Sequence, residues 1–443
     1  MNSDHSHSLI QLSPRIEGLL AQSENQIDVL VQIRAPVRHD LNKRAPLNLA
    51  IVLDRSGSMS GEPLHQAKRC AKYFVSQMQA LDQVAIIAYD NRACTLLPCQ
   101  AVGDGSSAMA AIDHIVSGGT TNLHLGWQTG AHELQPHVRT DSISRVLLLS
   151  DGRANQGIVD PDQITDACRN AAAGSISTST YGLGWHFNED LMAQMAQNGE
   201  GQAYFGETAE DLIEPFQQEF DLLSALYARQ VRLSVDTDVE ISAEVLNTYM
   251  GIHEKQLPDL AHDAEIWALV RFKVPAHLTG NGAGEMIRVG EIRITGRDLH
   301  GNPLQIGTAE CLLPSLMPLT YASQAEHELV ARRLGEVMAA RLQDKARRAA
   351  QNRNWQEVET LLAQARELAG NNPWVEAIIT NLERLARTMD SARFSKEARY
   401  SSHYLSTRYA ALDEERDDLA ISENEQSFTR RKRLQGKSSG KDQ

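Results

Sequence analysis

The chain has 443 residues and a formal net charge of -14, with 42% hydrophobic and 23% charged residues. This length exceeds what one hydrophobic core usually organises, so we expect two or three domains. The composition is that of an ordinary globular protein, and the negative charge argues against nonspecific binding to nucleic acid or to anionic membrane over the whole surface.

Residues 26–33 alternate between polar and apolar side chains, which predicts a half-buried strand. The same alternation returns much later, after residue 230. We therefore expect the amino-terminal unit, residues 1–43, to join that later sheet rather than the domain that follows it in sequence.

The unbroken aliphatic run at residues 49–53 predicts a buried parallel strand, and Asp54-Arg55-Ser56-Gly57-Ser58 follows it at once. Open α/β sheets bind ligands at the carboxyl ends of their strands, so a carboxylate and two hydroxyls would stand at such an edge. Hard oxygen donors at alternate positions suit a small octahedral cation such as Mg²⁺. On the alternative interpretation, the segment is an ordinary strand-to-helix turn with an N-cap.

Two further segments carry similar chemistry. Residues 117–121 form a glycine turn that opens a helix and ends in two threonine hydroxyls. The aliphatic run at residues 146–149 predicts another strand, and an Asp-Gly turn at residues 151–152 follows it. Three loops with oxygen donors, two of them at strand ends, predict one site.

The surrounding pattern predicts an α/β domain with a doubly wound, mainly parallel, Rossmann-like sheet covered on both faces. Further strands are expected at residues 84–89 and 177–183, and helices at residues 63–80, 123–134 and 162–173. In the segment after the last of these strands, we expect Asn188 to cap a helix. Trp185 and Phe187 are candidates for the rim of the cation site.

In order and spacing, the three loops resemble those of the von Willebrand factor A (VWA) family, over residues 45–224. The resemblance implies a metal-ion-dependent adhesion site that binds Mg²⁺, with Mn²⁺ or Ca²⁺ as alternatives. Its implied members are Ser56 and Ser58 as direct ligands, Asp54 acting mostly through water, Thr121 from the second loop and Asp151 from the third. Thr120 is the alternative to Thr121, which is preferred because the following residues then fall where the family's helix begins.

Beyond the VWA domain, residues 44–224, the pattern predicts an antiparallel β-sandwich over residues 225–320. Its expected strands are residues 230–235, 239–241, 264–272 and 287–294, with turns at residues 281–282 and 301–303. If the strand at residues 26–33 belongs to this sandwich, the VWA domain is inserted into it.

A helical region is expected over residues 321–412 and a disordered charged tail over residues 413–443. Helices are predicted at residues 327–350, at residues 355–369, and from Pro373 to Met389, with a weak tetratricopeptide-like pattern. We favour their packing onto the sandwich. The aromatic segment at residues 394–412 is either a docking helix for a partner or a cover for its own neighbours. The basic run at residues 430–433 is expected to be solvated.

The five cysteines are odd in number and scattered along the chain, which argues against a disulfide framework. We expect Cys94 and Cys99 to be small buried residues. The first eleven residues lack the pattern of a secretory signal, and no apolar run is long enough to cross a bilayer. These observations favour a cytoplasmic protein without a membrane span.

The sequence contains no HExxH motif, nucleophile elbow or phosphate-binding loop. The leading hypothesis is a non-enzymatic interaction module, an assembly or scaffold subunit, whose bound cation coordinates an Asp or Glu of a partner protein. The alternative is a metal-dependent hydrolase that uses the same site. The family resemblance further implies a MoxR-type AAA+ ATPase, or a stress or signalling complex, as the partner. No specific nucleic-acid partner is expected.

Overall fold

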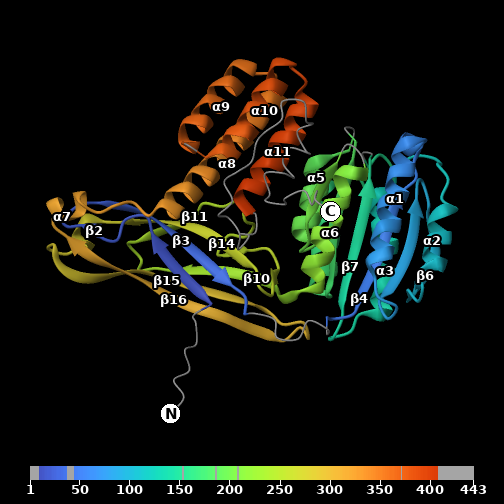
Figure 1. The fold of residues 1–443 in the computed structure, drawn as a ribbon, viewed down its shortest axis with the longest axis horizontal. Coiled ribbons are helices and arrows are strands. Elements are labelled where there is room, and N and C mark those ends of the chain that lie inside the picture. The colour runs from blue at the N-terminus through green and yellow to red at the C-terminus, as the bar shows by residue number, and fades with distance from the viewer. Residues whose placement is uncertain are drawn as a thin grey trace, which may run out of the picture.

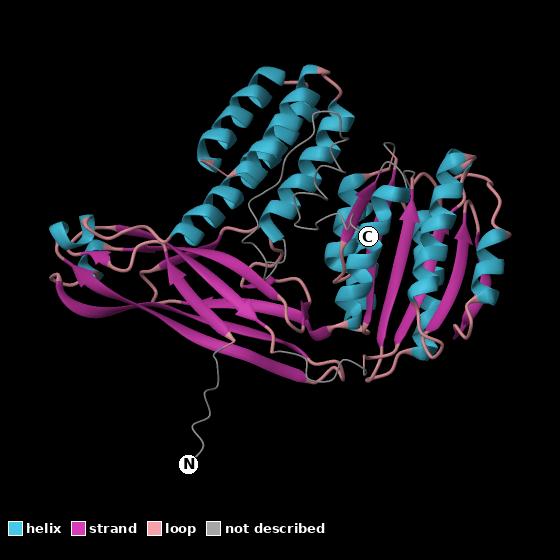
Figure 2. Ribbon diagram, in the orientation of Figure 1, coloured by secondary structure: helices cyan, strands magenta, loops and turns pink. Residues whose placement is uncertain are grey.

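The computed structural model describes residues 9–36, 44–151, 154–184, 187–206, 209–370 and 372–407. An α/β domain and a β-sandwich lie at the two ends of the long axis, and the carboxyl-terminal helices rise from the sandwich beside the α/β domain (Figure 1). In Figure 2 the α/β domain combines helices and strands, the sandwich consists mainly of strands, and the carboxyl-terminal region is helical; the predicted fold class is confirmed. No described helix is both long and apolar enough to cross a membrane.

The α/β domain contains a sheet with the order β6-β5-β4-β7-β8-β9. All neighbouring strands are parallel except the β5–β6 pair. The strands are β4 (Leu47–Asp54), β5 (Gln83–Tyr89), β6 (Ala93–Ala101), β7 (Ile143–Ser150), β8 (Ile176–Leu183) and β9 (Ala203–Gly206). The helices are α1 (Glu62–Gln77), α2 (Ser106–Asp113), α3 (Leu123–Leu134), α4 (Pro161–Ala173), α5 (Glu189–Asn198) and α6 (Ala209–Ser224).

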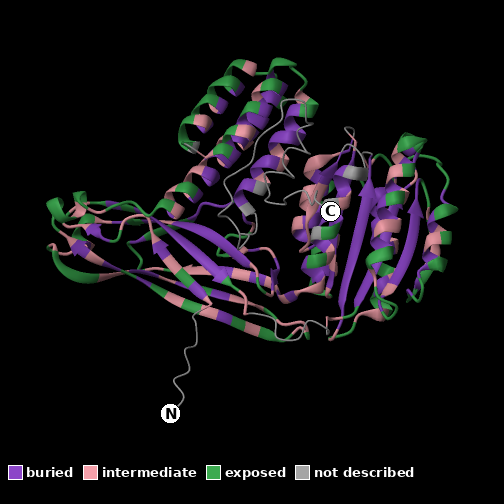
Figure 3. Ribbon diagram, in the orientation of Figure 1, coloured by how far each residue is buried: buried purple, intermediate pink, exposed green. Residues whose placement is uncertain are grey.

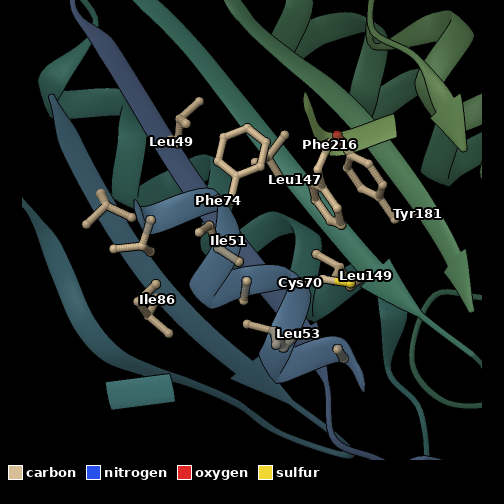
Figure 4. Close-up of a cluster of buried hydrophobic side chains, with 14 of the residues drawn as sticks. Leu49, Ile51, Leu53, Cys70, Phe74, Ile86, Leu147, Leu149, Tyr181 and Phe216 are labelled. Atoms are coloured by element: carbon tan, nitrogen blue, oxygen red, sulfur yellow. The ribbon is translucent and has the colours of Figure 1, made fainter. Parts of the chain in front are cut away.

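Helices cover both faces of this sheet, so β4 and β7 are buried along their whole length (Figure 3). Leu49, Ile51 and Leu53 face one layer and pack with Phe74 of α1 and Phe216 of α6 (Figure 4). The alternate residues of β4 face the other layer, where they join a cluster with side chains of α3, α4 and α5. Burial on both faces explains why these strands read as unbroken aliphatic runs.

The sandwich has a four-stranded sheet, β1-β3-β14-β11, and a six-stranded sheet, β12-β10-β15-β16-β2, with β13 beside β10. Its strands are β1 (Ile10–Pro14), β2 (Leu19–Leu20), β3 (Asn25–Arg34), β10 (Leu226–Asp236), β11 (Ser242–Val245), β12 (Glu254–Gln256), β13 (Leu260–Ala261), β14 (Glu265–Val274), β15 (Ala283–Arg297) and β16 (Pro303–Leu316). β3 pairs antiparallel with β14, from Asn25 opposite Val274 to Arg34 opposite Glu265. The chain therefore leaves the sandwich after β3, builds the α/β domain, and returns in β10.

Two local expectations are wrong. Residues 239–240 form a turn rather than a strand, and Val239 is fully exposed, so its apolar side chain marks no buried face. Cys94 is exposed, although Cys99 is buried as expected; all five cysteines are free thiols. Cys94 lies in the edge strand β6, where alternate residues leave the core.

A buried ion cluster joins the α/β domain to the sandwich. Arg145, near the start of β7, pairs with Glu219 of α6 at 2.5 Å and with Asp259 at 3.0 Å. Asp259 lies in the sandwich, between β12 and β13, and also accepts the backbone N–H of Gln230 at 3.2 Å. Separating the α/β domain from the sandwich would therefore leave buried charges unpaired, which costs free energy.

The helical region consists of α7 (Pro318–Ala322), α8 (Glu328–Gln351), α9 (Trp355–Ala369), α10 (Pro373–Arg387) and α11 (Ser391–Thr407). α8 packs on the sandwich, where its Val330 and Val337 join a cluster with Trp267. The guanidinium of Arg333 lies 4.8 Å from the centre of the Trp267 ring. Packing of this region onto the sandwich was the expected arrangement.

The aromatic helix α11 covers its own neighbours. Phe394 lies 6.0 Å from Trp355 of α9, and Tyr400 lies 5.6 Å from Phe205 of β9, between ring centres. Lys396 of α11 also forms a 2.7 Å ion pair with Glu189 in the first turn of α5. The described part of the segment is therefore not a free docking helix. Its end beyond residue 407, the predicted tail and the basic run lie outside the described residues.

Candidate metal centre

Two parallel strands place their acidic ends side by side. Asp54 is the last residue of β4, and Asp151 directly follows the neighbouring β7. Asp54 is fully buried; its Oδ1 accepts the N–H of Ser56 at 2.8 Å and its Oδ2 accepts the Ser150 hydroxyl at 2.7 Å. Burial raises the pKa of the Asp54 carboxyl above its ordinary value, and these hydrogen bonds partly oppose the shift.

The two serines of the first loop connect the carboxylates to the surface. Ser56 Oγ lies 3.1 Å from Ser58 Oγ, and Ser58 Oγ donates to Asp151 Oδ1 at 3.0 Å. Ser56 is buried, whereas Ser58 is exposed. Four of the five predicted side chains are therefore brought together in one continuous set of contacts, with Ser58 facing outward.

The glycine turn of the second loop lies against the first loop. Gly57 N–H donates to Gly119 O at 2.8 Å, and Gly118 N–H donates to Arg55 O at 2.7 Å. A pair of backbone bonds in opposite directions fixes the relative position of the two loops. No side chain is needed for this contact, so any metal ligand on the second loop is carried there by its backbone.

The Thr121 backbone is tied to Asn155 of the third loop, through both the side chain and the backbone of Asn155. Its N–H donates to Asn155 Oδ1 at 2.9 Å, and Asn155 N–H donates to Thr121 O at 3.1 Å. Thr121 is buried, whereas Thr120 is exposed and its hydroxyl donates to Gln156 Oε1. This difference in burial favours Thr121 over Thr120 as the inward-facing hydroxyl.

A third carboxylate at the same edge escaped the sequence analysis. Asp90 follows β5, pairs with Arg55 at 3.1 Å, and accepts the N–H of Gly119 at 3.3 Å. A Cβ on Gly118 would lie 2.1 Å from Asp90 Oδ2, so the glycine turn passes directly over this carboxylate. The available signal was the same as for Asp54: an acidic residue at the end of an aliphatic run, residues 84–89.

The segment between β8 and α5 was expected to supply Trp185 and Phe187 to the rim of the cation site, and for Phe187 this expectation is wrong. Phe187 is buried, packs 5.3 Å from the Phe205 ring, and lies under the Lys396 ammonium at 4.5 Å. It belongs to the core rather than to a rim because its ring fills the space above Gly182. Trp185 lies outside the described residues. The expected cap is confirmed, since Asn188 Oδ1 accepts the N–H of Leu191 at 3.1 Å.

The donor set fits a hard divalent cation. It offers only oxygen atoms, two carboxylates and three hydroxyls, which is the ligand chemistry of Mg²⁺ or Mn²⁺ rather than of zinc. Within the described ranges, no group of three or more His, Cys, Asp or Glu side chains forms an alternative metal cluster. The exposed Ser58 leaves one side of the set open to solvent or to an incoming ligand.

Comparison with known proteins points to the same region of the chain. Residues 48–219 match the family model of the von Willebrand factor type A domain. The uncharacterized protein sll0103 of Synechocystis sp. is 26% identical over 336 residues, which is 72% of this chain and 76% of that protein.

Two solved structures resemble the whole architecture. The von Willebrand factor type A protein from Catenulispora acidiphila is 15% identical with a TM-score of 0.65, covering 85% of this chain and 90% of that one. The ArnB paralog VWA2 from Sulfolobus acidocaldarius is 16% identical with a TM-score of 0.56, covering 90% and 98% respectively. At these identities the likeness concerns the fold.

Proposed function

Because residues 48–219 form a von Willebrand factor type A domain of the bacterial type, we propose that this chain is a metal-dependent protein-interaction module. VWA domains mediate protein interactions. In our proposal, Mg²⁺ is held by Asp54, Ser56, Ser58, Thr121 and Asp151, and it coordinates an Asp or Glu of a partner protein. The chain would act as an assembly or scaffold subunit in the cytoplasm.

One observation carries the proposal. Ser58 Oγ lies 3.1 Å from Ser56 Oγ and 3.0 Å from Asp151 Oδ1, so donors from two loops meet at an exposed hydroxyl. A cation there has protein oxygens on its inner side and remains accessible on its outer side. Mg²⁺ retains open positions for water when proteins bind it through few carboxylates, and a partner carboxylate replaces such a water at low cost.

The first test is calorimetric titration of the full chain with Mg²⁺ and Mn²⁺. Asp151→Ala removes a negative charge that faces the ion, so its affinity for the metal should fall at least about tenfold. The matched control is Asp141→Ala, which removes an exposed carboxylate at the opposite end of β7. Wild-type metal affinity in Asp151→Ala would refute the assigned ligand set.

The second test concerns the partner. A MoxR-type AAA+ ATPase from the same genome is the partner class to try first, and its capture should require Mg²⁺ and be lost in EDTA. The same preparation should be assayed for turnover of generic phosphoester and ester substrates. Metal-dependent turnover that Asp151→Ala abolishes would favour the alternative function, a hydrolase, over the interaction module.

A further inference from the structure

A pocket lies where the α/β domain, the sandwich and helix α11 meet. It encloses about 850 Å³ of empty space, including its open mouth, which is the size of a small-molecule site. Its walls come from α5 and β9 of the α/β domain, from residues 248–250 and 256–258 of the sandwich, and from α11. All of its described lining residues lie outside the three loops of the candidate metal centre, so the pocket is a separate feature.

The wall of this pocket is mainly apolar. Helix α5 contributes Met192, Ala193 and Ala196, whose spacing places them on one face of the helix. The sandwich contributes Met250 and Leu257 from the opposite side. A ligand in the pocket would therefore bury an apolar body between two domains.

One end of the pocket carries charge. Among the described residues that line it, Glu189 and Arg399 are the charged ones. Burial, and secondarily the charge of Arg399, lowers the pKa of His403 to about 4, so this third polar group is a neutral imidazole at neutral pH. The charge of a suitable ligand therefore depends on how Glu189 and Arg399 are paired.

The carboxylates at this end each have a close cationic partner: Glu189 with Lys396 at 2.7 Å, Asp190 with Arg347 at 3.0 Å and Asp344 with Arg348 at 2.9 Å. Arg399 approaches Asp190 and Asp344 only to 4.0 and 3.9 Å. Among the described residues, no group accepts a hydrogen bond from its guanidinium. Arg399 is thus the surplus cation of the cluster, with donors available to a bound anion.

We propose that this pocket binds a small monocarboxylate with an apolar body. The carboxylate pairs with the guanidinium of Arg399, whose planar fork matches its two oxygens. The apolar body packs against Met192, Ala193 and Leu257. Because the ligand contacts the α/β domain, the sandwich and α11 together, its binding also holds these three parts in one arrangement.

The test is calorimetric titration of the full chain with octanoate and with 2-naphthoate. Octanamide and 2-naphthamide are the uncharged counterparts of the same shape. All titrations are made in EDTA, so that a carboxylate bound to a metal ion contributes nothing. At least one acid should bind with one-to-one stoichiometry and about tenfold or more tightly than its amide, because a hydrogen bond to a charged group is worth at least that factor. The better acid shows whether the body is a flexible chain or a flat ring.

A change at Arg399 tests the charged end of the pocket. Arg399→Gln should remove the preference for the acid over the amide and leave the affinity for the amide unchanged. Arg393→Gln is the matched control, since it removes an arginine of the same helix whose side chain is 53% exposed. This control should keep the wild-type preference.

A change at Ala193 tests the apolar wall. Ala193→Leu adds three carbon atoms to the wall and should lower the affinity for acid and amide alike by roughly tenfold. Ala173→Leu, at the exposed end of α4, makes the same change away from the pocket and should have no effect. Circular dichroism of all variants should match that of the wild type.

Several outcomes would overturn the proposal. Equal affinity of the wild type for an acid and its amide, or a preference for the acid that survives Arg399→Gln, would show that Arg399 does not bind the carboxylate. Absence of saturable binding of both acids would show that the pocket is not such a site. Asp151→Ala should bind the acid as the wild type does; loss of binding in that variant would place the acid at the candidate metal centre instead.

Discussion

The Ser150 hydroxyl donates a 2.7 Å hydrogen bond to Asp54 Oδ2, joining the last residues of the neighbouring strands β4 and β7. Both side chains are fully buried. Ser150 is not a member of the donor set that the family resemblance implies. Its contact nevertheless orients the carboxylate at the base of that set, as outer partners commonly do for metal ligands.

We therefore expect Ser150→Ala to lower Mg²⁺ affinity by roughly tenfold, because Asp54 loses the donor that fixes its second oxygen. The free energy of unfolding should fall by about 1–3 kcal/mol, since the buried Asp54 carboxylate loses one of its hydrogen-bond donors. Titration calorimetry and urea unfolding measure the two effects. Ser144→Ala is the matched control: it is equally buried in β7 but lies near Asn48, at the other end of the strand. Equal metal affinities in the two variants would contradict this role.

Removal of metal should leave the fold intact. The sheet core is aliphatic, and the candidate ligands Ser58 and Asp151 are already hydrogen-bonded to each other. Circular dichroism should therefore be unchanged by EDTA, unlike that of a small zinc domain. Added Mg²⁺ should raise the free energy of unfolding by about 2.7 kcal/mol at a hundred times its dissociation constant. Loss of the helix and strand signal in EDTA would show that the ion is part of the fold.

Two glycines of the site should respond differently to Ala. A Cβ at Gly118 would lie 2.1 Å from Asp90 Oδ2, and Asp90 cannot turn away without losing Arg55 and the N–H of Gly119. Gly118→Ala should displace the loop that carries Thr121 and reduce Mg²⁺ affinity by roughly tenfold. In Gly57→Ala, the new Cβ finds its nearest neighbour at 3.6 Å, an ordinary contact. Its affinity should stay close to wild type, and the reverse order would disprove the steric argument.

The buried ion cluster between the domains should be sensitive to loss of Arg145. Arg145→Ala leaves Glu219 and Asp259 without their guanidinium partner, which should lower the free energy of unfolding by about 3–5 kcal/mol. The exposed pair formed by Arg139 and Asp141 provides the control; Arg139→Ala should cost at most about 1 kcal/mol.

The same variant should show a distinct pH dependence. Burial already raises the pKa of Asp259, so the folded protein binds a proton at this carboxyl more tightly than the unfolded chain does. Without Arg145 this preference grows, because the carboxylate has lost its attracting charge. The deficit of Arg145→Ala should therefore shrink as the pH falls toward the raised pKa. Urea unfolding at pH 8 and at pH 5 tests this, and an equal deficit at both would exclude the electrostatic explanation.

Strong local signals explain what could be predicted. α3 spans Leu123–Leu134, the predicted range, because its start is set by Asn122, which accepts the N–H of Leu125. β6 and α2 were missed because their local sequence signals are weak. α2 begins after Gly105 without a side-chain cap. β6 is a half-exposed edge strand whose pairing with β5 is irregular, so its side chains carry no clean alternation.

By itself, the sequence determined the parallel sheet and the three loops that bear oxygen donors, because both depend on residues adjacent in the chain. Only the tertiary structure decided which of these donors meet. Ser58 and Asp151 are separated by 93 positions, and Arg145 and Asp259 by 114. Their contacts arise from the pairing of β4 with β7 and from the return of the chain into the sandwich. Such contacts leave no local pattern, since each partner is selected by the packing of whole elements rather than by its neighbours in sequence.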